Sequence, residues 1–233
     1  MADTKDTAQQ QPKFDWDYDV PDTPFWRDLP FTAGRNFLTC YSPSELEDMN
    51  FDGTLSVPSK FAFLLSLLEA RLATRKAAAA PVLLHVADYP EWARLMLGIE
   101  TMQKNLDMPE EAETLRIMLE TSEGDRRVSW LNMLAGFKLR HGEYAEAERL
   151  EREVLPWMQK HERLGVDSPQ ALGTTRTIIE ALWKQGGSKV DEARRLAEET
   201  AVLVEAMGSS KFAKYQEEER QMLRDLVAEL EKS

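Results

Sequence analysis

The chain has 233 residues, of which 42% are hydrophobic and 30% charged, a balance typical of a folded globular protein. Its formal net charge of -12 disfavours nucleic acid as a partner, because phosphate binding requires a cationic face. The single cysteine, Cys40, excludes an internal disulfide, and the acidic first twenty residues lack the apolar core of a signal peptide. We therefore expect a cytoplasmic protein, with the nucleus as the alternative, that binds neither membrane nor nucleic acid.

Residues 1–41 differ in composition from the rest of the chain. Four prolines, at 12, 21, 24 and 30, exclude a long helix, and aromatic residues are frequent among them. Such an aromatic surface is unusual for a free linker. We expect an irregular acidic and aromatic extension, part of which docks on the body of the protein.

Helical patterns begin at residue 42. Ser42, Pro43 and Glu45 are typical of a capping box, and a second helix is predicted from about Pro58 into the alanines at 77–80. A third begins at Asp88. Apolar residues at three- and four-residue steps then predict helix pairs at 109–121 with 125–141, 143–163 with 168–186, and 188–207 with 210–231. We expect an all-α domain over 42–231, capped by an amphipathic helix over 212–231.

An alanine that follows acidic residues recurs early in three of these helices. These alanines are Ala112, Ala147 and Ala193, spaced by 35 residues (147 − 112) and 46 residues (193 − 147). A small residue is expected where two helices cross closely, since a larger side chain would push them apart. The spacing is typical of helical repeats, and a non-repetitive helical bundle is the alternative.

The clearest unit combines Leu134-Ala135 with Gly142 and the run Glu143-Tyr144-Ala145-Glu146-Ala147. Together with the segments 132–135 and 164–175, it resembles the tetratricopeptide repeats of the kinesin light chain type, over about residues 90–231. The resemblance implies antiparallel helix pairs stacked as a right-handed superhelix. It also implies a non-catalytic scaffold that holds a peptide or protein segment in a concave groove.

The resemblance also implies which residues face that groove, because the helix before each alanine lines it. The residues selected in this way are Arg94, Lys104, Asn132, Arg140, Arg176, Glu180, Trp183 and Lys184. Most are basic or carry an amide, so an acidic peptide is the expected ligand. Arg176 stands where the family commonly has Asn, which leaves the family's backbone clamp in doubt. The alternative is that these are ordinary solvated helix positions.

A candidate ligand lies in the chain itself. Phe14, Asp15, Trp16 and Asp17 resemble the tryptophan peptides flanked by acids that kinesin light chain repeats bind. An aromatic anchor supplies buried area while the carboxylates meet basic side chains. We expect this segment to mask the groove in cis, and a tail that serves stability alone is the alternative.

Evidence for catalysis is sparse. The three histidines form no recognisable metal or nucleophile motif, so we expect no catalytic residue, no metal and no cofactor. The alternative is an enzyme or small-molecule binder with a pocket near His85, Asp88, Tyr89 and Trp92, in which His85 or Asp88 acts as acid or base. The expected partner is a protein or peptide, and a homodimer is left open.

Overall fold

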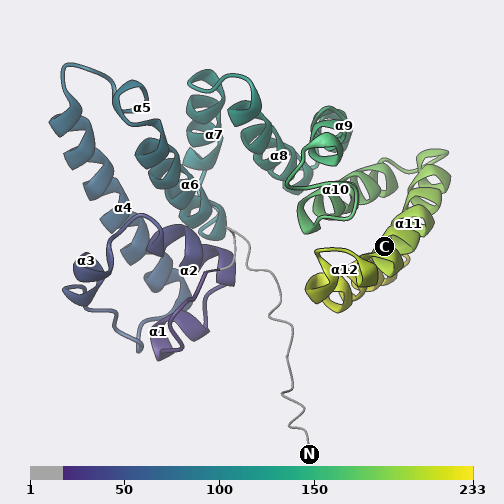
Figure 1. Cartoon of the computed structure of the whole chain (residues 1–233), viewed down its shortest axis with the longest axis horizontal. Helices are drawn as coiled ribbons and strands as arrows, with labels where there is room; N and C mark the ends of the chain where they lie inside the picture. The colour runs from purple at the N-terminus through teal and green to yellow at the C-terminus, as the bar shows by residue number, and fades with distance from the viewer. Residues whose placement is uncertain (1–17, 233) are drawn as a thin grey trace, which may run out of the picture. The chain divides into compact units, whose positions relative to one another are not determined.

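The structure is a computed structural model that describes residues 18–232, which form helices and no strand (Figure 1). The prediction of an all-α protein is confirmed for this part of the chain. The α-helices are α1 (Pro24–Arg27), α2 (Phe31–Leu38), α3 (Pro43–Glu47), α4 (Val57–Ala79), α5 (Leu84–Ala87), α6 (Tyr89–Asn105), α7 (Glu110–Glu120), α8 (Asp125–Arg140), α9 (Tyr144–Lys160), α10 (Pro169–Gln185), α11 (Lys189–Ala206) and α12 (Gln216–Leu230). Two short 3₁₀ helices, η1 (Met207–Ser209) and η2 (Ala213–Tyr215), separate the last two. None of the helices in residues 18–232 combines the length and the apolarity needed to cross a bilayer.

The described residues divide into two compact units, 18–123 and 124–232, and each is considered by itself. In the first unit α6 is central, because α2, α4, α5 and α7 all pack against it. In the second unit α8 packs on α9, α9 on α10 and α10 on α11. Helix α12 contacts both α10 and α11, and α8 also contacts α10.

The N-terminal extension contributes to the core of the first unit. Phe25 and Trp26 of α1 are almost fully buried, with ring centroids 5.1 Å and 4.9 Å from that of Phe51. Phe37 of α2 is also fully buried. The expectation that part of residues 1–41 docks on the body is therefore confirmed. The expectation of an irregular extension differs from the structure over residues 24–38, where prolines at the start of α1 and before α2 permit two short helices.

A buried lysine fastens α1 to α4. The side chain of Lys60 is 0% exposed, and its Nζ donates to the Pro24 carbonyl oxygen at 2.9 Å and to Asp28 Oδ2 at 2.7 Å. It also lies 5.4 Å from the centroid of the Phe25 ring. A buried ammonium is tolerated only with such partners, so these contacts fix the docked extension.

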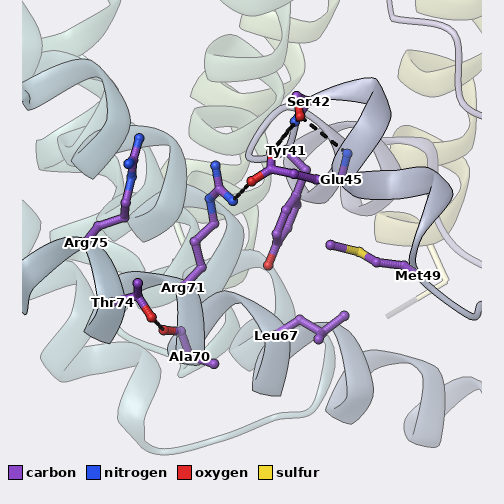
Figure 2. A pocket seen from close by; sticks show the side chains of 9 residues that line it. All are labelled: Tyr41, Ser42, Glu45, Met49, Leu67, Ala70, Arg71, Thr74 and Arg75. Atoms are coloured by element: carbon purple, nitrogen blue, oxygen red, sulfur yellow. Dashed lines mark hydrogen bonds and ion pairs between the residues drawn. The ribbon is translucent and has the colours of Figure 1, made fainter. Parts of the chain in front are cut away.

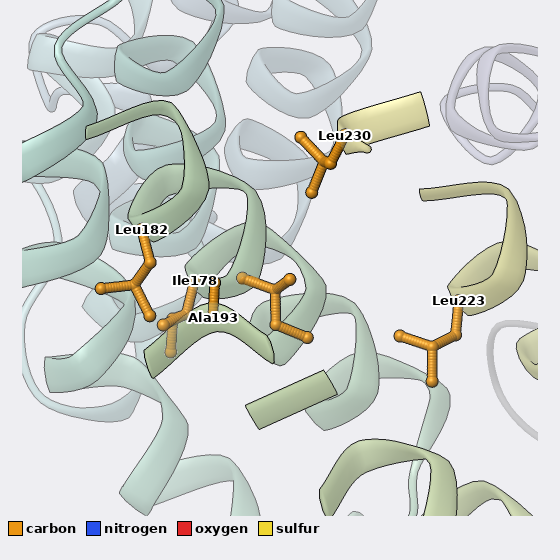
Figure 3. Close-up of a cluster of buried hydrophobic side chains, with 6 residues drawn as sticks. Ile178, Leu182, Ala193, Leu223 and Leu230 are labelled. Carbon is orange, nitrogen blue, oxygen red and sulfur yellow. The ribbon is translucent and has the colours of Figure 1, made fainter. Parts of the chain in front are cut away.

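In the second unit the turns between helices depend on glycine. Gly142 follows α8 with φ of 77° and Gly186 follows α10 with φ of 73°. Only glycine adopts this left-handed region without a steric cost. Between α10, α11 and α12 a hydrophobic cluster forms from Ile178, Ile179, Leu182, Ala193, Leu223 and Leu230 (Figure 3).

The three alanines of the sequence motif have different environments. Ala147 of α9 and Ala193 of α11 are fully buried, as the close-crossing argument predicts. Ala112 of α7 is exposed, and Glu111 and Leu115 face the interior instead. The steric prediction is therefore wrong for Ala112, because the buried stripe of α7 begins one residue earlier than the motif suggests.

Candidate functional site

The predicted groove residues are divided between the two units. Arg94 and Lys104 lie on α6 of the first unit, whereas the other predicted groove residues lie on α8 and α10 of the second. The alignment that selected Arg94 and Lys104 used Ala112 as its anchor, and the exposure of Ala112 removes its steric basis. The second unit therefore offers the better-defined surface.

Asn132 links three helices of the second unit through a buried acid. Its Nδ2 donates to Glu151 Oε1 at 2.9 Å and Oε2 at 3.0 Å, and lies 3.0 Å from Thr174 Oγ1. Glu151 is 1% exposed. Burial raises the pKa of Glu151 to about 8, against the opposing effect of the hydrogen bonds from Asn132 and Thr174. The acid is therefore mostly neutral near pH 7, and Asn132 holds α8, α9 and α10 together.

Arg176 joins α10 to α12. Its Nη1 forms an ion pair with Oε2 of Glu219, and both side chains are largely buried. Burial raises the pKa of Glu219, and the charge and hydrogen bond of Arg176 counteract that effect. The positive charge of Arg176 is thus largely neutralised within the fold, which the sequence did not reveal.

Three further predicted groove residues follow along α10. Glu180 is half-buried, and burial raises its pKa while the nearby Lys184 lowers it. Lys184 itself is exposed. Trp183 faces α11, where the Arg194 guanidinium lies 5.2 Å from the centroid of its ring. Among the predicted groove residues of α8 and α10, the exposed cations are therefore Lys184 and Arg140, which ends α8.

Two glycines on these helices were not selected from the sequence. A Cβ at Gly136 of α8 would meet only Nη1 of Arg140 at 3.8 Å, and a Cβ at Gly173 of α10 only Nη2 of Arg176 at 3.6 Å. Both positions are therefore open, and an arginine lies beside each backbone. A glycine inside a helix costs about 1 kcal/mol relative to alanine. Glycine inside an amphipathic pattern was the sequence signal that could have identified them.

In the first unit Arg94 belongs to an arginine cluster around Glu91. Arg94 Nη2 lies 3.2 Å from Glu91 Oε2, and Arg75 Nε lies 2.9 Å from Oε1. Burial alone would raise the pKa of Glu91, but the hydrogen bonds from Arg75 and Arg94 outweigh it and the pKa is lowered. Lys104 is exposed near the end of α6. This cluster fixes α4 against α6.

An open cavity of about 610 Å³ adjoins this cluster, between α3 and α4. Figure 2 shows Arg71 reaching from α4 to Glu45 of α3, 2.6 Å away, and its guanidinium lies 4.5 Å from the centroid of the Tyr41 ring. The hydrogen bonds from Arg71 and Ser42 lower the pKa of Glu45 to about 2. Both cations that line the cavity, Arg71 and Arg75, are therefore already paired with acids.

The pocket predicted near His85 is assembled only in part. His85 and Trp92 line a cavity of about 330 Å³, with ring centroids 5.9 Å apart. Asp88 is not among its lining residues, because its carboxylate accepts a hydrogen bond from the Glu91 backbone N at 3.0 Å and caps α6. The hydroxyl of Tyr89 is hydrogen-bonded to Ser122 at 2.9 Å. Of the two residues expected to act as acid or base, His85 lines this cavity and Asp88 does not.

The cis-ligand and metal expectations concern other parts of the chain. Phe14, Asp15, Trp16 and Asp17 lie outside residues 18–232, so the cis-ligand hypothesis stays a prediction. Among the described residues, no group of three or more His, Cys, Asp or Glu side chains is placed to hold a metal ion.

Comparisons of the chain with protein-family models, with curated proteins and with solved structures gave no match.

Proposed function

We propose that the second unit is a tetratricopeptide-like scaffold without catalytic function, which holds an acidic peptide against α8 and α10. The observation that carries this proposal is the pair of open glycines, Gly136 and Gly173, on the two helices that also carry the exposed cations Arg140 and Lys184. A helix surface without a Cβ allows the main chain of a ligand to approach closely, and a guanidinium is suited to binding carboxylates. Retaining two glycines at a cost in helix stability favours a binding role over a packing role.

The supporting helix arrangement is consistent with repeats. Each helix from α8 to α11 packs on the next, the small residues Ala147 and Ala193 are buried at the crossings, and α8, α10 and α12 form one row of neighbours. The enzyme alternative has less support, because Asp88 is engaged in capping α6 and lies outside the cavity that His85 lines.

The probe for this proposal is a fluorescently labelled synthetic peptide with the sequence of residues 12–20. It carries the tryptophan flanked by aspartates, and a second peptide with alanine for that tryptophan is the control. Fluorescence anisotropy would measure the binding of both peptides to the full chain. We expect a Trp16→Ala chain to bind the first peptide more tightly than the unmodified chain, because the cis competitor is weakened. Absence of binding by either chain would refute the acidic-peptide preference.

Two sets of variants locate the site. Gly136→Leu and Gly173→Leu each place a side chain in open space, so they should retain or raise helix stability and yet weaken peptide binding about tenfold, which corresponds to about 1.4 kcal/mol. Arg140→Glu combined with Lys184→Glu should abolish binding through repulsion. Arg149→Glu, an exposed change on α9, is the matched control. Equal loss of binding in the control would show that net charge, and not this surface, attracts the peptide.

A further inference from the structure

A second surface of the same unit is an open, largely apolar cavity of about 520 Å³ between α11 and α12. Its floor is formed by Trp183 of α10 and Leu223 of α12, and its walls by Ala197 and Ala201 of α11 and Val227 of α12. The two alanines occupy successive turns of α11. Because small side chains permit short distances between helix axes, this face of α11 is shaped to receive another helix.

The charges at the rim of the cavity are balanced on each helix. On α11, Arg194 and Glu198 are exposed one turn apart, and on α12 Arg224 and Glu231 are both exposed. The guanidinium of Arg194 lies over Trp183, which holds it at the edge of the apolar floor. A purely acidic partner would be repelled by the rim glutamates, and a purely basic partner by the rim arginines. The surface therefore favours a partner that carries both acidic and basic side chains.

The corresponding face of another helix, α9, already forms ion pairs with a neighbouring helix of the same chain. The spacing of 46 residues (193 − 147) places Glu148 and Arg152 of α9 in register with Arg194 and Glu198 of α11. On α9 these two side chains form ion pairs with residues of α11. Glu148 pairs with Lys189 at 3.2 Å, and Arg152 pairs with Glu192. Side chains of matching charge from α11 therefore reach that face of α9. On α11 the order of the two charges is reversed, and the face opens into the cavity.

We propose that a second copy of this chain covers the cavity, with the two α11 helices packed antiparallel about a two-fold axis. An acid and a base one turn apart are self-complementary in that arrangement, because Arg194 meets the partner's Glu198 while Glu198 meets the partner's Arg194. A register that joins residue 194 to residue 198 places the two-fold axis level with residue 196, so Ala197 lies beside the axis and Ala201 lies toward one end of the interface. Helix α12 adds Val227 and Leu223 to the buried surface. This interface uses α11, α12 and Trp183 of α10, and it includes neither the two open glycines nor Arg140 or Lys184 of the proposed peptide surface.

The test is the oligomeric state of the full chain, measured by sedimentation velocity and by light scattering after size exclusion. The unmodified chain should form dimers over the micromolar range. Arg194→Glu should weaken the dimer by at least about tenfold, because two acids then face two acids, and Glu198→Arg should do so because bases face bases. Circular dichroism would check that each variant keeps its helix content.

Mixing supplies the decisive control. A chain with Arg194→Glu and a chain with Glu198→Arg should form a mixed dimer although neither dimerises alone, and the double variant R194E/E198R should dimerise like the unmodified chain. Arg149→Glu, on an exposed face of α9, should leave the dimer intact. A chain that remains monomeric throughout, with the cavity bound by a different protein or by none, would overturn the proposal. A dimer unaffected by either single reversal would overturn it as well.

Discussion

The buried acid Glu151 provides a direct test of the packing of α8, α9 and α10. Replacing it with glutamine keeps the shape of the side chain and removes its ability to ionise. In the folded chain the pKa of Glu151 is raised to about 8 from its ordinary value of 4.5. The unfolded chain therefore loses this proton above about pH 4.5, whereas the folded chain keeps it until about pH 8. The contribution of Glu151 to stability accordingly falls as the pH rises through that window.

The size of the effect follows from the two pKa values. Each pH unit between them changes the free energy of unfolding by about 1.4 kcal/mol, so the change between about pH 5 and about pH 8 is about 4 kcal/mol. Glutamine lacks this dependence, but its NH₂ group replaces one of the two oxygens that accept from Asn132. We expect Glu151→Gln to be less stable than the unmodified chain by about 1 kcal/mol at low pH, and more stable by about 3 kcal/mol at about pH 8.

Urea denaturation followed by circular dichroism, at several pH values, would measure the difference between the two chains. Other titrating groups cancel in this difference, so its slope with pH reports Glu151 alone. Glu153→Gln is the matched control, because Glu153 is exposed on the same helix. Parallel stability curves for Glu151→Gln and the unmodified chain would refute the assignment of a neutral, buried Glu151.

Three further predictions concern the rest of the fold. The Cys40 thiol is buried, which raises its pKa to about 12, so it should react with thiol reagents only after denaturation, as mass spectrometry would show. Asp28→Ala should lower the free energy of unfolding by about 2 kcal/mol because it leaves the buried Lys60 with one partner fewer, and a denaturation curve unchanged by the substitution would contradict this. Ala147→Leu should cost about 1–3 kcal/mol by overpacking the buried face of α9, whereas Ala112→Leu should be nearly neutral in the same thermal unfolding assay.

The helices themselves were predictable because their signals are local. Ser42 and Glu45 form the predicted capping box, with Glu45 Oε2 accepting from the Ser42 backbone N at 2.7 Å. Gly142 and Gly186 end α8 and α10 in the left-handed conformation that a turn after a helix requires. Apolar periodicity and end signals depend on residues a few positions apart, so a sequence displays them directly.

The surface of the second unit was less predictable. The sequence selects Asn132 and Arg176 as groove residues by their position along the helix. Their side chains, however, are held by Glu151 and Glu219, which lie 19 and 43 residues away in the chain. A pairing over such a distance leaves no local pattern.

Ala112 and Ala147 also show that a local sequence pattern does not decide which residues are buried. The motif around them is almost identical in sequence, yet one alanine is exposed and the other is fully buried. Local signals in the sequence indicated the helical class and most of the helices after residue 42, because backbone hydrogen bonding and amphipathicity are set within a few turns. They missed α1 and α2, and they placed the start of the last helix at residue 210, whereas α12 begins at Gln216. Only the tertiary structure decided which small residues lie at helix crossings, which charges are neutralised, and which faces stay open, because each depends on side chains that distant segments bring together.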